Sequence, residues 1–470
     1  MSATAIAGMA IGEVVADLEI AGAWAVDPAS GRQGPADVLV ADGILREVCW
    51  LEGDAAAGID DGGVIVAPGL IDLHAHLREP GNEDAETIAS GLAAAGHGGF
   101  TTVCAMPNTD PPLDDAAVLA RLRAAVAASG SPVGVLAHGA VTVGRAGERL
   151  AALGELADGG VIGFSDDGAP VRTAAVLRSA LLYAGGLGLP IVDHPEDVGL
   201  AEGAEASDGL IATVLGLRGV ASAGEEAAVA RDIAVLEDVL RDEPRARLHL
   251  THVSTAGALR LIADAKGRGL PVTCDVTPHH VALSDEWLAG ARRWAWEGSG
   301  DPWSDGALVA APYATSLRVN PPLRSVTDAA ACLTAVADGT ADAIATDHAP
   351  HAVVDKDVEF GLAATGISGL ETALGTVLAA VAAGRLGLGR ALAALTIGPA
   401  AVLGQRLGRP VGLIEGAPAD LVAFDRAESW TVTADTLVSR GRNTPLLGRS
   451  LPGRVLLTVA GGRLAYVAED

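Results

Sequence analysis

The chain has 470 residues, of which 50% are hydrophobic, and its 59 Asp and Glu against 32 Lys and Arg give a formal net charge of −27. This length exceeds one ordinary hydrophobic core, so we expect one large domain and a smaller one, and the hydrophobic content excludes global disorder. The acidic balance argues against a nucleic acid as partner, because a polyanion would be repelled.

The first 66 residues contain short stretches in which apolar and polar residues alternate, separated by turns. The clearest is Ala-Asp-Val-Leu-Val-Ala-Asp-Gly-Ile at residues 36–44. A period of two is typical of a strand with one buried face. We therefore predict that residues 1–66 form the N-terminal part of a β-sandwich.

A buried strand is predicted over residues 64–71, and two histidines and an arginine follow it. The sequence from residue 71 to 81 is Ile-Asp-Leu-His-Ala-His-Leu-Arg-Glu-Pro-Gly. Residues two apart in a strand point to the same side, so His74 and His76 can reach one metal ion together, and Arg78 continues the alternation. Neutral imidazole is a common ligand of zinc. Alone, however, a His-x-His pair is a weak signal, because two polar residues at a strand end are the simpler interpretation.

From residue 64 to 348 one pattern repeats: a short apolar run, polar residues at its C-terminal end, and an Ala- and Leu-rich segment of helical character. Strands that alternate with helices imply parallel pairing, and eight such units predict a (β/α)8 barrel with its catalytic groups at the C-terminal strand ends. We assign the metal-dependent barrel to residues 67–408. The eight runs end at residues 74–76, 106–108, 138–139, 165–168, 193–194, 249–252, 277–280 and 346–348.

One connection, from Asp285 to Arg318, is long and rich in tryptophan. Long loops in compact domains are often lids or contact surfaces. We favour the simpler interpretation, in which the tryptophans pack this segment onto the barrel. The segment holds four of the seven tryptophans of the chain, Trp287, Trp294, Trp296 and Trp303.

Alternating strands return in residues 409–470, at residues 420–424 and 455–459. We predict that this region is the C-terminal part of the same β-sandwich, so that the two ends of the chain meet and the barrel is inserted between them. The predicted fold class is therefore α/β, a (β/α)8 TIM-type barrel with a small β-sandwich domain formed by both chain termini.

The predicted strand ends supply six side chains that are able to bind a metal. Their nitrogen and oxygen atoms suit one or two divalent ions, and zinc is the best match, with two zinc ions favoured. The four cysteines form no Cys-x-x-Cys pair, so a thiolate site is not indicated. The six candidate ligands are His74, His76, Asp167, His194, His252 and Asp347.

Two ions about 3.5–4 Å apart need a bridging group, and a carboxylate can give one oxygen to each of them. Asp167 is our candidate for this bridge. Its neighbour Asp166 is the competing choice, because the residues alone do not say which aspartate of the pair points inward.

Several longer motifs follow the same strand ends. In this order they resemble the motifs of bacterial dihydroorotases of the amidohydrolase superfamily, and the resemblance extends from about residue 13 to 465. The motifs are His-Ala-His-Leu-Arg-Glu-Pro-Gly at 74–81, Ala-Met-Pro-Asn-Thr at 105–109, Phe-Ser-Asp-Asp-Gly at 164–168, Thr-His-Val-Ser at 251–254, Val-Thr-Pro-His-His at 276–280, Val-Asn-Pro-Pro-Leu-Arg at 319–324 and Ala-Thr-Asp-His-Ala-Pro-His at 345–351.

The resemblance implies how the six candidates divide. The residues that match His74, His76 and Asp347 bind one zinc ion in that family, and those that match His194 and His252 bind the second. In the branch that this chain resembles, the aspartate that matches Asp167 bridges the two ions, where other members use a carboxylated lysine. No lysine occupies this stretch of the chain.

The resemblance also implies a set of substrate contacts. Arg78, Asn108 and His351 match groups that hold the substrate, and the backbone near Asn320 and Gly366 matches further contacts. The residue types suit these roles independently. The planar fork of an arginine fits a carboxylate, and an amide N–H of an asparagine can donate to the same carboxylate.

Asp347 is the candidate catalytic residue, because one carboxylate can take a proton from the attacking water and return it to a leaving nitrogen. The reaction implied by the resemblance is the zinc-dependent, reversible cyclisation of N-carbamoyl-L-aspartate to L-dihydroorotate in pyrimidine biosynthesis. The small-molecule partner is then this substrate pair.

Two alternatives stay open. Allantoinase and dihydropyrimidinase keep the zinc histidines but bridge the ions with a carboxylated lysine, so the Asp166-Asp167 step and the pair of Arg78 and Asn108 argue against them. An inactive dihydroorotase-like subunit that only scaffolds aspartate transcarbamoylase would be expected to have lost metal ligands, whereas all six candidates are present here.

No apolar run approaches the ~18 residues that cross a bilayer, and the first residues carry too little positive charge for a signal peptide. We therefore expect a cytoplasmic enzyme with no membrane partner. We also expect a homo-oligomer, a dimer, and the resemblance allows assembly with aspartate transcarbamoylase.

Overall fold

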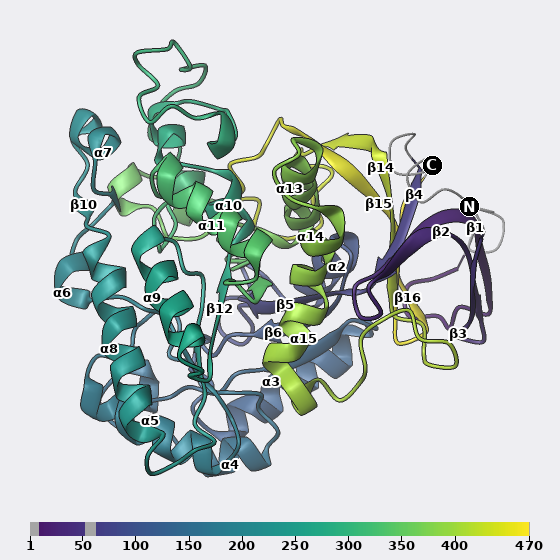
Figure 1. Ribbon diagram of the computed structural model, residues 1–470, viewed down its shortest axis with the longest axis horizontal. Helices are drawn as coiled ribbons and strands as arrows, with labels where there is room; N and C mark the ends of the chain where they lie inside the picture. The colour runs from purple at the N-terminus through teal and green to yellow at the C-terminus, as the bar shows by residue number, and fades with distance from the viewer. Residues whose placement is uncertain (1–8, 52–62, 470) are drawn as a thin grey trace.

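Strands from both ends of the chain form one sheet in the computed structural model, which describes residues 9–51 and 63–469 (Figure 1). The strand order in this seven-stranded sheet is β16-β15-β14-β4-β1-β2-β3. The prediction that the two termini meet is therefore confirmed. The strands are β1 (Asp17–Asp27), β2 (Arg32–Ala41), β3 (Ile44–Trp50), β4 (Val64–Pro68), β14 (Leu421–Thr431), β15 (Ser450–Ala460) and β16 (Arg463–Val467).

The alternation of apolar residues decides which side of this sheet is buried. In β2, Val38 and Val40 are fully buried and belong to one cluster with Leu421 of β14 and Leu457 of β15. Strands from both ends of the chain therefore enclose a common core, as expected for the predicted β-sandwich. The domain boundaries after residues 66 and 408 stay a prediction, and residues 1–8 and 52–62 of the first predicted part lie outside the described residues.

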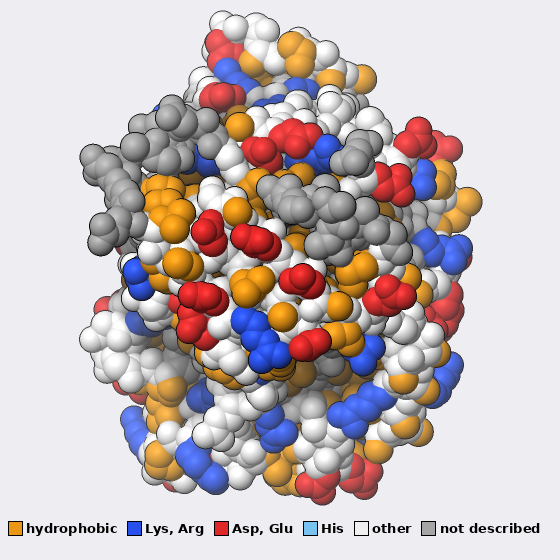
Figure 2. Space-filling view, turned by 90° about the vertical axis from the view of Figure 1, so that its right-hand side faces the viewer, with side chains coloured by type: hydrophobic (Ala, Val, Ile, Leu, Met, Phe, Trp, Pro, Cys, Tyr) orange, Lys and Arg blue, Asp and Glu red, His pale blue; other side chains and the backbone are white. Residues whose placement is uncertain are grey.

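The surface over the terminal strands is mixed in charge. On the face that is turned to the viewer in Figure 2, Asp and Glu side chains lie among Lys, Arg and hydrophobic side chains. The excess of acidic residues is thus spread over this face rather than gathered in one patch.

Parallel strands form the barrel, in two sheets that single-residue bridges join. Phe164 pairs with Gly139 on one side and with Ile191 on the other, and Ala75 pairs with His348 to close the ring. The eight predicted runs therefore form a closed barrel in the described part of the chain, with the fourth strand reduced to Phe164. The seven longer strands are β5 (Leu70–Ala75), β6 (Phe100–Ala105), β7 (Gly134–Ala137), β8 (Ile191–Asp193), β11 (Leu248–Leu250), β12 (Val272–Val276) and β13 (Ala343–Ile344).

The single strand predicted over residues 64–71 is two strands, and this prediction was wrong. β4 pairs with β1 and β14 in the terminal sheet, whereas β5 pairs with β6 in the barrel. Gly69 makes the junction, because a Cβ at this position would lie 2.3 Å from the side chain of Thr101. Arg78 does not continue the alternation either. β5 ends at Ala75, and Arg78 has a φ of 60°, in the left-handed region.

Helices cover the outside of the barrel (Figure 1). Several of them begin at a side chain that caps their first free N–H groups, such as Thr87, Asp115 and Thr255. Within the described ranges, no helix is both long and apolar enough to cross a membrane. The main helices are α2 (Ile88–His97), α3 (Ala116–Ser129), α4 (Leu153–Asp158), α5 (Ala174–Gly186), α8 (Ala223–Val239), α9 (Ala256–Gly267), α11 (Val326–Asp338), α13 (Leu370–Ala382), α14 (Leu388–Leu395) and α15 (Ile397–Leu403).

Shorter elements lie in the connections between the barrel strands and helices. Residues 206–207 and 219–220 pair as a small parallel ladder of β9 and β10. The short helices are α6 (Val198–Ala201), α7 (Leu210–Leu215), α10 (Pro278–Ala282), α12 (Val353–Lys356) and the 3-10 turns η1 (Val143–Arg145), η2 (Asp285–Ala289), η3 (Ala295–Glu297), η4 (Thr315–Leu317), η5 (Phe360–Leu362) and η6 (Gly404–Leu407).

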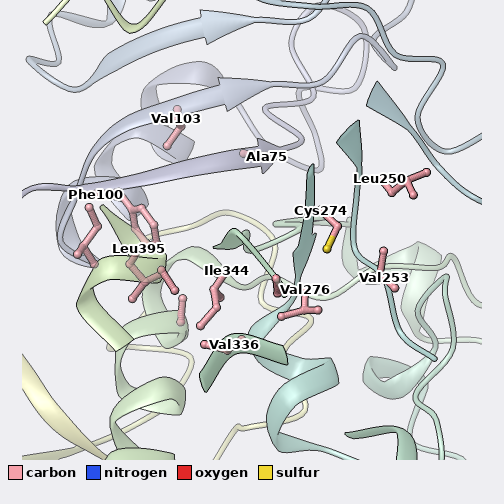
Figure 3. Close-up of a cluster of buried hydrophobic side chains, with 14 of the residues drawn as sticks. Ala75, Phe100, Val103, Leu250, Val253, Cys274, Val276, Val336, Ile344 and Leu395 are labelled. Atoms are coloured by element: carbon pink, nitrogen blue, oxygen red, sulfur yellow. The ribbon is translucent and has the colours of Figure 1, made fainter. Parts of the chain in front are cut away.

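The main core lies where barrel strands meet the helices around them. Phe100 of β6 and Ile344 of β13 are fully buried in one cluster with Val336 of α11 and Leu395 of α14 (Figure 3). Full burial of such a side chain contributes about 1.5–3 kcal/mol to folding. The packed core holds the strands in place, and the polar residues at their C-terminal ends are therefore carried on a rigid frame.

The tryptophan-rich segment packs against the rest of the protein. Trp287 is 1% exposed and Trp294 is 9% exposed, and both belong to a buried cluster with Leu283. The guanidinium of Arg449 lies 3.7 Å from the ring centroid of Trp294. These two tryptophans thus pack the segment against the rest of the protein, in part against the C-terminal region, and its packing onto the barrel itself stays a prediction.

Candidate metal centre and active site

The six candidate ligands converge at the C-terminal end of the barrel. Each follows or ends a strand or the Phe164 bridge, so parallel pairing brings their side chains to one edge. Each is at most 5% exposed, which keeps bulk water away from their polar atoms. They are His74, His76, Asp167, His194, His252 and Asp347.

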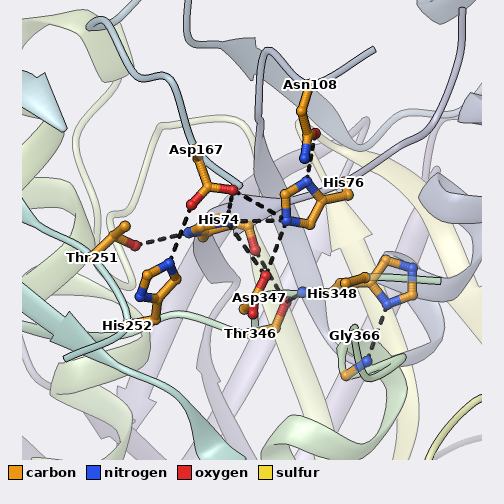
Figure 4. Close-up of polar contacts among 12 residues, drawn as sticks. His74, His76, Asn108, Asp167, Thr251, His252, Thr346, Asp347, His348 and Gly366 are labelled. Atoms are coloured by element: carbon orange, nitrogen blue, oxygen red, sulfur yellow. Dashed lines mark hydrogen bonds and ion pairs between the residues drawn. The ribbon is translucent and has the colours of Figure 1, made fainter. Parts of the chain in front are cut away.

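Four ligand atoms form a first group (Figure 4). Nε2 of His74 and Nε2 of His76 are 3.2 Å apart, and Oδ1 of Asp347 lies 3.4 Å from the first and 3.0 Å from the second. Oδ2 of Asp167 lies 3.2 Å and 3.5 Å from the same two nitrogens. A zinc ion with bonds of about 2.0–2.1 Å has tetrahedral edges of about 3.3 Å. The donor types and their spacing therefore fit a four-coordinate zinc ion.

A second group shares the carboxylate of Asp167. Nδ1 of His194 lies 2.8 Å from Nε2 of His252. Oδ1 of Asp167 lies 3.2 Å from the His252 nitrogen and 3.7 Å from the His194 nitrogen. Asp167 thus presents one oxygen to each histidine pair, which is the arrangement that a bridging carboxylate needs.

Asp166 is directed away from the histidines. Its Oδ1 accepts hydrogen bonds from the backbone N–H groups of Val141, at 2.9 Å, and Thr142, at 3.0 Å, and its Oδ2 accepts one from the Thr142 hydroxyl. These bonds tie two neighbouring strand ends together. Of the two aspartates that the residues alone did not distinguish, Asp167 is the one that faces the ligands.

Buried carboxylates raise the pKa of two of the ligand histidines. Burial lowers the pKa of His74, but the carboxylates of Asp167 and Asp347 outweigh it and raise the pKa to about 9. Burial likewise lowers the pKa of His194, and Asp167 and Glu196 raise it to about 10. Burial raises the pKa of Asp347, yet the neighbouring histidines hold it below its usual range. Two buried carboxylates therefore create a negative potential that suits a cation.

Arg78 and Asn108 lie beside the first group. Nε of Arg78 donates to the carbonyl of Pro350 at 3.0 Å. Oδ1 of Asn108 lies 2.7 Å from Nδ1 of His76 and accepts its N–H. The amide nitrogen is therefore the part of Asn108 that can donate to a ligand.

His351 also lies close to Arg78. Its Nε2 donates to the carbonyl of Thr365 at 2.9 Å and is 3.4 Å from a guanidinium nitrogen of Arg78. Burial and the charge of Arg78 lower the pKa of His351 to about 3, so its ring is neutral at physiological pH. His351 is thus placed to contact a ligand as a neutral group beside a cation.

Asn320 joins the site through its side chain, whereas the resemblance pointed to its backbone. Nδ2 of Asn320 donates to Glu196 at 2.8 Å and lies 3.3 Å from Nε2 of His194. A cavity of about 160 Å³ opens beside it and is lined in part by Glu196, Arg318 and Thr365. Space for a small molecule therefore adjoins the second histidine pair.

Gly366 shapes the wall of the site. Its N–H donates to Arg318 at 2.8 Å and its carbonyl accepts from Asn443 at 3.0 Å. Its φ is 151°, and a Cβ here would lie 2.7 Å from the carbonyl of Ala349 and 2.9 Å from His351. Only glycine fits this position, and its predicted contact with substrate stays a prediction.

Two residues that we did not predict from the sequence also touch the site. Glu196 lies 3.4 Å from Nε2 of His194, and Arg145 donates to the backbone carbonyls of Asp166, at 3.3 Å, and Asp167, at 2.5 Å. Glu196 follows the candidate ligand His194 by two residues, and this spacing could have indicated that its side chain lies at the site. Arg145 lies in a connection without a pattern that would have marked it.

Known proteins that are similar to this chain share a common name. A family model described as "Dihydro-orotase-like" matches residues 62–255. A protein named "Dihydroorotase" from Anaeromyxobacter dehalogenans (strain 2CP-1 / ATCC BAA-258) is 47% identical over 452 residues, which are 96% of this chain and 98% of that protein. One of the same name from Pelotomaculum thermopropionicum is 44% identical over 450 residues, 95% of this chain and 98% of that protein.

Among solved structures, the chain is similar to an L-hydantoinase (dihydropyrimidinase) from Arthrobacter aurescens, with a TM-score of 0.77 and 22% identity over 97% of each chain. It is also similar to a dihydropyrimidinase from Brevibacillus agri NCHU1002, with a TM-score of 0.72 and 21% identity over 96% of this chain and 95% of that one. At this identity the likeness concerns the fold alone, and it confirms the predicted fold class.

Proposed function

This chain belongs to the dihydroorotase family, and from that membership we propose how it interconverts N-carbamoyl-L-aspartate and L-dihydroorotate in pyrimidine biosynthesis. It is a cyclic amide hydrolase. One observation carries the proposal: the carboxylate of Asp167 presents one oxygen to each of two buried histidine pairs. An aspartate in this place distinguishes the site from that of ureide hydrolases that use a carboxylated lysine.

We propose that the resident metal is zinc, with two ions per chain. The first group, His74, His76 and Asp347, would hold one ion, and His194 and His252 would hold the other, with Asp167 shared between them. What such ions supply when bound is Lewis acidity, which polarises a ring carbonyl and lowers the pKa of water. The donor set, its burial and its spacing support this assignment.

Asp347 is our proposed acid–base residue. In the direction of ring opening, its carboxylate takes a proton from the water that attacks the ring carbonyl. It then delivers this proton to the ring nitrogen as the carbon–nitrogen bond breaks, which gives N-carbamoyl-L-aspartate. In the direction of synthesis, Asp347 takes the proton from the ureido nitrogen as the new bond forms, and one water is released. A carboxylate whose pKa is held below its usual range is ionised at physiological pH, the charge state from which this cycle begins.

Arg78, Asn108 and His351 are our proposed substrate-holding groups, with Asn320 and Gly366 completing the wall. A guanidinium and an amide N–H on adjacent strand ends can both donate to the carboxylate that remains outside the reacting bond. The contacts of Arg78 with Pro350 and of Asn108 with His76 restrict both side chains before substrate arrives. This restriction reduces the entropy lost on binding.

Arg78→Ala is expected to raise the KM for dihydroorotate by about 10- to 100-fold, because hydrogen bonds to a charged group contribute about 1.5–3 kcal/mol. Steady-state kinetics in both directions would measure the effect. Arg78→Lys is the matched control, since it keeps the charge but loses the planar fork, and it should fall between the parent and the alanine variant. An unchanged KM in Arg78→Ala would rule out the proposed contact between Arg78 and the substrate carboxylate.

The proposed substrate can be tested against the rings of related enzymes. The zinc-loaded protein is incubated with dihydroorotate, hydantoin and allantoin, and each ring is followed by chromatography. We expect the dihydroorotate ring to open at least about a hundredfold faster than the other two rings. Hydantoin and allantoin leave Arg78 and Asn108, the proposed partners of the substrate carboxylate, unpaired. Faster opening of hydantoin or allantoin would instead favour a hydantoinase-like or allantoinase-like enzyme.

The second candidate function, an inactive scaffold for aspartate transcarbamoylase, predicts a different outcome. Such a protein would open none of the three rings, and its metal content would be low after zinc loading. The buried, mutually facing ligands argue against it. A cytoplasmic location, a homodimer and assembly of the active enzyme with aspartate transcarbamoylase stay proposals, and light scattering of the purified protein with and without that partner would test the last two.

A further inference from the structure

Each metal-facing histidine presents one ring nitrogen inward, and its other nitrogen lies against the protein. The inward nitrogen can bind a cation only when it carries no proton, so the outer nitrogen must carry it and needs an acceptor. For His76 this acceptor is Oδ1 of Asn108, at 2.7 Å, and for His194 it is Glu196, at 3.4 Å. The amide oxygen of Asn108 cannot donate in return, so it fixes the tautomer of His76, whereas Nε2 of His194 also lies 3.3 Å from the amide nitrogen of Asn320.

The group beside the outer ring nitrogen of His74 does not by itself determine which nitrogen carries the proton. Its Nδ1 lies 2.8 Å from the hydroxyl of Thr251 (Figure 4). A hydroxyl can donate or accept, so Thr251 by itself is compatible with either tautomer of His74. The group behind Thr251 decides which one is present.

That group is the carboxylate of Asp275, a fully buried residue in β12. The Thr251 hydroxyl donates to Oδ2 of Asp275 at 3.1 Å, and Nε2 of His249 reaches the same oxygen at 2.8 Å. Because a carboxylate only accepts, the hydroxyl proton of Thr251 points to Asp275. The lone pairs of Thr251 then face His74, whose proton must sit on Nδ1 and leave Nε2 open toward the first group.

The other oxygen of Asp275 supports the second group. Oδ1 accepts the backbone N–H of His252 at 2.7 Å. His252 has a φ of 40°, a conformation that costs free energy for any residue except glycine. Within the described residues, Nδ1 of its ring has no hydrogen-bond partner, so the backbone bond to Asp275 is a principal polar restraint on this ligand.

We infer that Asp275 is a positioning residue for both ion sites: through Thr251 it sets the metal-binding tautomer of His74, and through the backbone it holds His252. This inference rests on the proposed metal centre. No ligand atom is contributed by Asp275 itself. Its removal should therefore weaken metal binding without deleting a ligand.

Asp275→Asn tests the inference at the carboxylate. An amide has only one oxygen, so in either orientation its NH2 group faces a donor, either Thr251 and His249 or the N–H of His252. We expect the affinity for zinc to fall about 10- to 100-fold, the usual effect of removing an outer partner of a metal ligand. Competition with a chelator of known affinity measures it, and metal content after dialysis gives a second readout.

Two substitutions of Thr251 test the link from Asp275 through the Thr251 hydroxyl to His74 while the carboxylate of Asp275 is kept. Thr251→Val removes the oxygen that accepts from His74 and should weaken zinc binding at the first group, whereas Thr251→Ser keeps the hydroxyl and should restore it. Thr273→Val is the matched control. The Thr273 hydroxyl contacts Nδ1 of His249 at 2.8 Å, on the far side of that ring from Asp275, and its loss should leave zinc affinity at the parent value.

The outcomes separate this inference from the proposed function. If the parent protein binds no zinc, the metal centre itself is wrong. If the parent binds zinc and both Asp275→Asn and Thr251→Val bind it as tightly, the metal centre stands and the positioning role is overturned. Should Asp275→Asn not fold, the comparison of valine and serine at residue 251 decides alone: a Thr251→Val variant that unfolds at the parent temperature but binds zinc more weakly, with affinity restored by serine, supports the positioning role, and equal zinc affinity of the two overturns it.

Discussion

Asp347→Asn is expected to lower kcat by about 10³–10⁴-fold, the upper part of the range for loss of a general acid–base group. Asparagine has nearly the same shape, and its oxygen can still face His76, from which Asp347 Oδ1 lies 3.0 Å. It cannot take a proton from water or return one to nitrogen. Both directions of the reaction should therefore fail together, as measured with dihydroorotate and with N-carbamoyl-L-aspartate.

A loss of kcat in Asp347→Asn points to an acid–base role only if the variant still binds the substrate. Binding of dihydroorotate, measured by calorimetry, should remain detectable, because Arg78 and Asn108, which are proposed to bind the substrate carboxylate, are unchanged. Asp342→Asn is a matched control, since Asp342 directly precedes β13 at its opposite end and pairs with Lys266. Its kcat should equal that of the parent. If Asp347→Asn keeps its activity within about tenfold, a loss of about 1.4 kcal/mol or less, Asp347 is not the acid–base residue.

If the chain binds two zinc ions as proposed, Asp167→Asn is expected to reduce them to one and to lower kcat/KM by about 10²–10³-fold, since a bridging ligand helps to place both ions of such a site. The reason is geometric: Oδ2 lies 3.2 Å from His74 and Oδ1 lies 3.2 Å from His252. An amide offers one oxygen and one NH2 group, and the NH2 group cannot replace the second ligand atom. Elemental analysis of the dialysed protein would count the ions.

The neighbouring Asp166→Asn is the control, because it changes the same charge one residue away. Asp166 accepts hydrogen bonds from two backbone N–H groups and the Thr142 hydroxyl, so its substitution should cost about 1–3 kcal/mol of stability and leave the zinc content at the parent value. Thermal unfolding measures the first effect and elemental analysis the second. The reverse pattern, with zinc lost from the Asp166 variant, would show that the bridge had been assigned to the wrong aspartate.

The sequence was sufficient to predict where the candidate residues converge, because their positions obey a local rule. Side chains such as His74, His194 and Asp347 come directly at the ends of apolar runs, and in a parallel barrel all these ends share one face. Spacing within a strand also placed His76 on the same side as His74. These predictions need only the periodicity of the chain and the handedness of its connections.

Other features depend on contacts between residues far apart in the chain, which periodicity does not reveal. The break at Gly69 arises from the close approach of Thr101, and the side chain of Asn320 is held by Glu196. Asp275 lies within an apolar strand, and its role appears only once Thr251 and His252 are seen to donate to it. The motif resemblance narrowed the choice between Asp166 and Asp167, and the fold then gave it a physical basis.

The junction at Gly69 has a consequence for the order in which the protein is assembled. β4 lies between β1 and β14 in the terminal sheet and leads through Gly69 into β5, the strand that carries His74. During synthesis β1 is made early, but β14 begins only at Leu421. Until then β4 has one open edge, which is a site for mispairing with other chains. β4, the strand that leads into the strand carrying His74, is thus paired on both sides only after β14, which begins about nine tenths of the way along the chain, has been synthesised.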